Sequence, residues 1–178
     1  MWALVESDSV TKIYTRPKQL TLGDVNYPSN IFSMWTSSEL EAIGIYEVVI
    51  NNTNYKNKEY YINTDQSFTF DSGTVTATYG TATAIGLVGL KTTHKEKINN
   101  QAGNLLRHTD WMVIRATEGG TAVPSETTTW RAAVRTKANS MQAQIDGAAN
   151  VDALAALYEY NDATPPVRPL GEFPVLGA

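Results

Sequence analysis

Apolar and polar residues alternate in short runs through the first half of the chain. Residues 2–5 are apolar, residues 7–9 read Ser-Asp-Ser, and residues 10–14 carry two polar residues among apolar ones. Two such runs on either side of turn residues predict a β-hairpin. Pro17 then ends the second strand or keeps it at a sheet edge, because proline has no amide hydrogen to donate.

Four more strands are predicted after this hairpin. Residues 45–50 carry apolar side chains on both faces, which indicates a buried, central strand. Shorter runs at 59–62, 67–70 and 74–79 follow, and the Asp-Ser-Gly sequence at 71–73 predicts a turn between the last two.

One short helix is predicted within the strand-rich half. Thr36 and Glu39 have the spacing of a capping box, in which each side chain binds the backbone amide of the other residue. Trp35 and Leu40 occupy the positions of a hydrophobic staple. Gly44 is expected to end the helix after about two turns.

From about residue 87 the apolar period lengthens to that of helices. The first predicted stripe consists of Leu87, Leu90, His94, Ile98, Ala102, Leu105 and Leu106. Asp110 is expected to cap a second helix that carries residues 111–117 and stops at Gly119-Gly120.

A third helix is predicted after Pro124, with a stripe suited to packing against another helix. The stripe consists of Trp130, Val134, Ala138, Met141 and Ile145. Gly147 closes this helix, and Asn150 is expected to cap a short last one.

The predicted fold is α+β, since strands come first and helices second. We expect a strand-rich module at 1–84 that ends in a linker of small residues at 80–84, and a helical-hairpin module at 85–160. Residues 161–178 hold four of the seven prolines and are expected to form an extended tail rather than a folded segment.

Composition narrows the classes of function. The net charge of −4 argues against nucleic acid or an anionic membrane as the main partner. The absence of cysteine removes thiol nucleophiles and thiolate metal sites. The longest apolar stretch, residues 85–90, is too short to span a membrane, and the N-terminus lacks the pattern of a signal peptide. We therefore expect a soluble protein.

No catalytic constellation is apparent, so we predict no enzyme activity, no metal and no cofactor. The sequence of residues 86–92 partly resembles that of a phosphate-binding loop but lacks its Gly-Lys-Ser/Thr end. His94 and His108 are the only histidines, and their spacing fits no metal motif. Arg131 and Arg135 are expected on a solvated helix face.

The helical half resembles a known family in three motifs. Residues 105–111 read LLRHTDW, residues 123–124 read Val-Pro, and an aromatic-Arg pair follows at 130–131 before Arg135. This order resembles the helical module of phage tail fibre assembly proteins and tail assembly chaperones, and the resemblance covers roughly residues 87–147.

The N-terminal half resembles modules of marine and cyanobacterial phage structural proteins. The similar segments are Arg-Pro-Lys at 16–18, Gly-Asp-Val at 23–25, Tyr-Pro at 27–28 and Ile-Gly-Ile-Tyr-Glu at 43–47.

These resemblances imply a non-enzymatic protein that helps a tail fibre to fold or trimerise, or caps it. The partner would be the fibre, another tail or baseplate protein, or a second copy of this chain. The protein would be found in the virion, or in the host cytoplasm during assembly. The candidate partner-binding residues are Trp111, Trp130, Arg131, Arg135, Pro165, Pro166 and Phe173. Trp111 and Trp130 would contact the partner or anchor the packing of the helices.

Two alternative functions stay open. The first is a permanent structural subunit of the tail or baseplate that connects the fibre. The second is a carbohydrate-binding module that contacts the host surface, which predicts that Tyr55, Tyr60 and Tyr61 are exposed in a shallow groove.

Overall fold

The computed structural model describes residues 1–177 and confirms the predicted α+β class. The chain divides into two compact units, Met1–Thr83 and the part from Ala84 onward, each of which is described by itself. The first unit contains, in chain order, β1 (Trp2–Glu6), β2 (Ser9–Tyr14), β3 (Leu20–Leu22), β4 (Val25–Tyr27), α1 (Ile31–Met34), α2 (Ser37–Glu41), β5 (Ile45–Asn51), β6 (Tyr61–Ile62), β7 (Gln66–Asp71) and β8 (Thr74–Tyr79).

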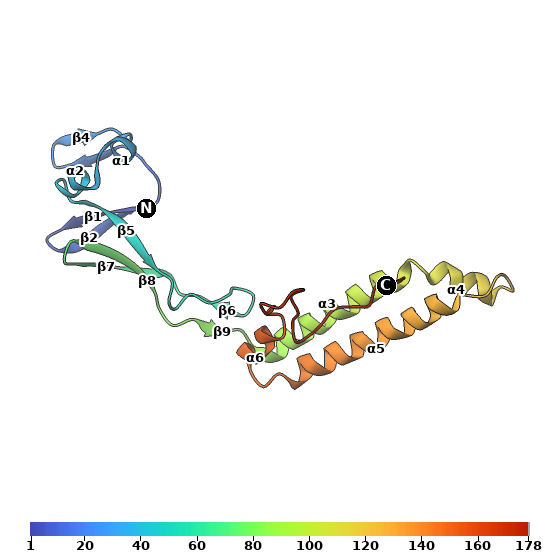
Figure 1. Ribbon diagram of the computed structural model, residues 1–178. Helices are drawn as coiled ribbons and strands as arrows, with labels where there is room; N and C mark the ends of the chain where they lie inside the picture. The colour runs from blue at the N-terminus through green and yellow to red at the C-terminus, as the bar shows by residue number, and fades with distance from the viewer. Residues whose placement is uncertain (178) are drawn as a thin grey trace. The chain divides into compact units, whose positions relative to one another are not determined.

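A mixed five-stranded sheet forms the body of the first unit, in the order β2-β1-β5-β8-β7 (Figure 1). All neighbours are antiparallel except β5 and β8, which run parallel. The sheet curls so that its edge strands, β2 and β7, approach each other. β5 is the central strand, as predicted.

Two-residue turns close both hairpins of this sheet. Ser7 and Asp8 between β1 and β2 have φ values of 50° and 58°, and Ser72 and Gly73 between β7 and β8 have 49° and 82°. Positive φ at both central residues matches the right-handed twist of the flanking strands. Both predicted turns are therefore confirmed.

Each face of the sheet covers its own apolar cluster. Because successive strand residues point to opposite faces, Leu4 of β1 packs with Ile45 and Phe32, whereas its neighbour Ala3 packs with Val48 and Val75.

The prediction that β5 is buried was wrong for its last residues. Val49 and Ile50 are exposed although their strand is central. The predicted strand at 59–62 is likewise reduced to β6, which pairs with β9 (Thr83–Ala84) in the predicted linker.

The capping box of α2 is present as predicted. The Thr36 amide donates to Glu39 Oε2 at 2.7 Å, and the Glu39 amide donates to Thr36 Oγ1 at 3.3 Å. Gly44 ends the segment with a φ of 79°, and a Cβ there would lie 2.9 Å from the carbonyl oxygen of Val5. Glycine is thus required both by backbone conformation and by the close approach of β1.

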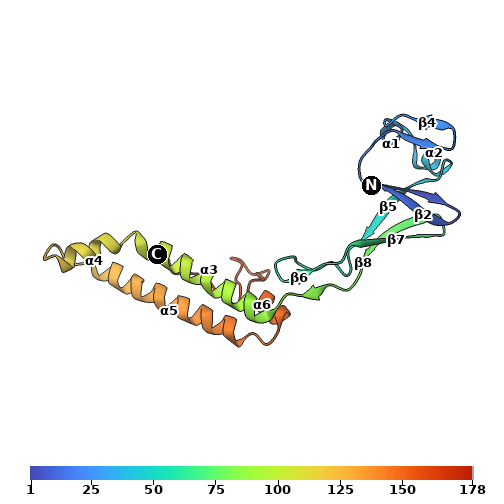
Figure 2. The ribbon, with the colours of Figure 1, turned by 180° about the vertical axis from the view of Figure 1, so that it is seen from behind.

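The second unit contains α3 (Leu87–Arg107), α4 (Asp110–Thr117), α5 (Ser125–Gly147) and α6 (Val151–Ala156). α3 and α5 lie side by side in opposite directions, and α4 lies at the end of this hairpin (Figures 1 and 2). The predicted α5 stripe is buried in full, and Leu90, His94, Ile98 and Ala102 of the α3 stripe are buried as well. No described helix is long and apolar enough to cross a membrane.

The C-terminal segment is irregular but is packed rather than free. The side chain of Leu170 is 0% exposed, and its amide donates to the carbonyl of Leu157 at 3.0 Å. The Trp130 Nε1 donates to the carbonyl of Pro174 at 2.9 Å. The expectation of a tail that is not folded was therefore wrong, because proline prevents regular structure without preventing apolar burial.

Candidate functional site

The turn between α3 and α4 is held by one buried arginine from α5. Arg131, only 8% exposed, donates from Nη1 to the Leu106 carbonyl at 2.8 Å and to Thr109 Oγ1 at 2.5 Å. Its Nη2 donates to Asp110 Oδ1 at 2.8 Å. The planar guanidinium thus satisfies a carbonyl at the end of α3 and fixes the start of α4.

Two expectations about this turn were wrong. Arg131 does not lie on a solvated face, because its fork of donors is used inside the unit. Asp110 is not the N-cap of α4; Thr109 holds that position without a side-chain cap hydrogen bond, and the Asp110 carboxylate turns to Arg131. The Thr109 hydroxyl donates to the Leu106 carbonyl at 3.0 Å, which completes the network.

The next residue, Trp111, faces outward. Its side chain is 52% exposed, and those of Val113 and Ile114 are 39% and 58% exposed. No residue of α4 is buried. Trp111 therefore does not anchor the packing of the hairpin, because about half of its side chain is in solvent and α4 buries none of its residues.

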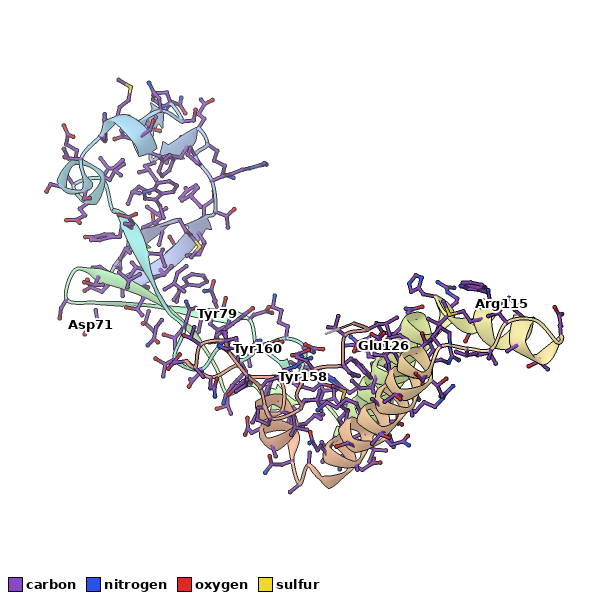
Figure 3. All side chains as sticks on the ribbon, turned by 45° about the vertical axis from the view of Figure 1, so that its right-hand side comes forward. Asp71, Tyr79, Arg115, Glu126, Tyr158 and Tyr160 are labelled. Atoms are coloured by element: carbon purple, nitrogen blue, oxygen red, sulfur yellow. The ribbon has the colours of Figure 1, made fainter. Side chains whose placement is uncertain are left out.

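Near the end of α4, the Arg115 side chain lies over a ring of Trp111. The Arg115 guanidinium carbon lies 4.8 Å from the centre of a Trp111 ring, and Figure 3 shows Arg115 on α4. The Gly120 amide donates to the Arg115 carbonyl at 3.0 Å, and the Gly119 amide donates to that of Ala116 at 3.3 Å. These bonds form a Schellman motif at the predicted Gly-Gly stop. We refer to Trp111, Ile114 and Arg115, which share one face of α4, as the tip surface.

The other candidate residues lie apart from the tip surface. Trp130 is buried beneath the C-terminal segment, whereas Arg135, Pro165 and Pro166 are exposed. Phe173 is half-buried and lines a shallow groove together with Leu105 and His108. Of the two tryptophans, only Trp111 is placed to touch a partner directly.

The described residues contain no group of three His, Asp or Glu side chains that could hold a metal ion. His94 is buried, and its Nδ1 lies 2.8 Å from the Tyr158 hydroxyl, so this histidine is part of the packing of the second unit.

The tyrosines of the carbohydrate-binding alternative are only partly exposed. Tyr60 is buried at 4% exposure, contrary to the expectation, whereas Tyr55 and Tyr61 line a groove in the first unit. Tyr60 is buried, so it cannot contribute to this groove.

Comparisons with protein-family models, curated proteins and solved structures found no match to this chain.

Proposed function

We propose that this chain is a non-enzymatic, chaperone-like protein that associates with a bacteriophage tail fibre through the tip surface of α4. The observation that carries the proposal is a helix without buried residues, hydrogen-bonded at its start to Arg131, that presents Trp111 and Ile114 to solvent. Tryptophan and arginine are enriched in interface hot spots, and here Arg115 lies against the exposed Trp111.

The motif resemblance supplies the class of partner. Thr109 and Asp110 of the Thr-Asp-Trp motif bind Arg131 of the Trp-Arg motif, and the third member, Trp111, is left exposed. Two of the three motifs that carry the resemblance are thus in contact, and Trp111 at their junction is left exposed.

A fibre is a suitable partner on physical grounds. Long β-rich trimers have high contact order, so they fold slowly and expose apolar surface and strand edges before assembly. A rigid apolar surface on a folded helper protein can cover such surface with little loss of conformational entropy on its own side.

We place the contact on α4 rather than on the sheet of the first unit. Pairing of a fibre strand with a sheet edge requires a free edge. The edge strands β2 and β7 approach each other through the curl of the sheet, which leaves less room for an added strand.

A permanent subunit of the tail or baseplate is the second candidate, and the packed C-terminal segment favours it over a protein with a free docking peptide. The test is to express the tail fibre of the same genome with and without this chain. Soluble trimer that forms only with the chain is expected, and lasting co-elution would make the chain a fibre component. A fibre that trimerises alone, with nothing bound, would refute the proposal.

A further inference from the structure

A groove of about 490 Å³ lies in the first unit, where the end of β8 meets the loop around β6. Its volume is within the range of small-ligand sites. The lining residues that matter for its chemistry are Tyr55, Lys58, Tyr61, Asp65, Gln66 and Tyr79. Tyr79 is labelled in Figure 3.

The loop that forms the groove is long and is held by polar side chains. The Asn63 amide bonds the Lys56 backbone twice, accepting from its N–H and donating to its carbonyl, both at 2.8 Å. Asn54 Nδ2 donates to the Tyr79 carbonyl at 3.0 Å. Long loops with little regular structure are usually either functional or disordered. The hydrogen bonds of Asn54 and Asn63 fix the conformation of this loop, so the groove that it forms is present before any ligand binds.

The groove combines aromatic rings with polar side chains that have no partner among residues 1–177. The rings of Tyr55 and Tyr79 lie 4.9 Å apart and are tilted by 57°. Among the described residues, the side chains of Asp65 and Gln66 make no hydrogen bond or ion pair, so their oxygens and the Gln66 amide face solvent. Aromatic faces attract polarised C–H groups, and a carboxylate beside an amide binds hydroxyl groups.

We infer that this groove binds a carbohydrate through a neutral pyranose unit. A sugar ring offers both C–H faces for the tyrosines and vicinal hydroxyls for Asp65 and Gln66. A nucleic acid fits less well, because the groove is lined by one lysine, Lys58, which lies over the Tyr55 ring, and by one carboxylate, Asp65, and the chain carries a net charge of −4. The inference concerns a different unit from the tip surface and does not depend on it.

The test uses the full chain and a panel of methyl glycosides of glucose, galactose, mannose, rhamnose and N-acetylglucosamine. Saturation-transfer difference NMR detects binding, and amide chemical shifts locate it. We expect at least one glycoside to bind with shifts confined to the loop and the end of β8. Asp65→Ala should weaken that binding about tenfold or more, since a hydrogen bond to a charged group is lost.

Asp71→Ala is the matched control, because Asp71 is an exposed carboxylate of the same unit at the β7–β8 turn (Figure 3). It should bind like the unaltered protein. Tyr55→Ala should abolish glycoside binding. If the Tyr55→Ala variant fails to fold, Asp65→Asn is measured in its place. Asp65→Asn is expected to bind the glycoside more weakly than the unaltered protein. The inference is overturned if no glycoside binds, if Asp65→Ala binds normally, or if a single-stranded oligonucleotide occupies the groove instead.

Discussion

At the scale of single residues, Arg131 connects the two helices at the end of the hairpin. Its three hydrogen bonds reach the last turn of α3, the intervening Thr109 and the first residue of α4. The sequence indicated Trp111 and Arg131 as members of two separate motifs, but it did not indicate that Trp111 is exposed and Arg131 buried. An apolar residue in a helical pattern looks the same whether it faces the core or the solvent.

Replacing Arg131 with Ala is expected to destabilise the second unit by about 2 to 3 kcal/mol, because buried acceptors lose charged donors. Urea unfolding followed by circular dichroism measures the change. Arg131→Lys should not restore stability, since an ammonium group cannot reproduce the planar fork.

Arg135→Ala is the control for Arg131. Arg135 lies one turn along the same helix, is exposed, and donates from Nη1 to the Arg131 carbonyl at 3.4 Å. Its loss should change stability by no more than about 0.5 kcal/mol. Equal effects of the two alanine substitutions would contradict the role given to Arg131.

At the scale of elements, features that depend on neighbouring residues were predicted well, and features that depend on tertiary contacts were predicted poorly. The capping box, the two-residue turns and the α5 stripe depend on residues close in sequence, so the sequence was sufficient to find them. Strands β3 and β4 and helix α1 were missed, because runs of three or four residues are too short to show a period. The exposure of Val49 and Ile50 depends on which elements cover the sheet.

The capping box predicts a pH dependence. Two hydrogen bonds to the Glu39 carboxylate lower the pKa of Glu39 below its ordinary value. The larger effect comes from the Thr36 backbone amide and the smaller from the Thr36 hydroxyl. A lowered pKa stabilises the fold above the pKa of the unfolded chain, and this stabilisation is lost as the pH falls through the folded-state pKa.

Stability measured from about pH 6 to about pH 3 should therefore show a shrinking difference between the unaltered protein and Glu39→Gln. Glu41→Gln, an exposed change in the same helix without a cap contact, should keep the pH dependence of the unaltered protein. If the stability difference between the unaltered protein and Glu39→Gln grew as the pH fell, the capping carboxylate would not have the stabilising role given to it.

The C-terminal segment gives a second prediction at this scale. Leu170 is fully buried, so Leu170→Ala is expected to cost about 2 to 5 kcal/mol of stability. Val175 in the same segment is 73% exposed, and Val175→Ala should be neutral. Equal melting temperatures for both variants would mean that the segment does not pack as described.

At the scale of the whole molecule, each unit has its own apolar core and its own candidate surface. Periodicity alone was enough to predict the change from strands to helices. It did not predict the tip surface or the groove, because both depend on polar contacts between segments far apart in sequence. Arg131 lies 21 residues from Asp110, and Asn54 lies 25 residues from Tyr79.

The most direct test of the central claim is the affinity of purified tail fibre for three forms of this protein: unaltered, Trp111→Ala and Val88→Ala. Val88 is an exposed apolar helix residue of the same unit, away from the tip surface, and serves as the control. We predict that Trp111→Ala weakens binding by about 2 kcal/mol or more at an unchanged melting temperature, whereas Val88→Ala binds normally. Fibre binding that is unaffected by Trp111→Ala would contradict the account.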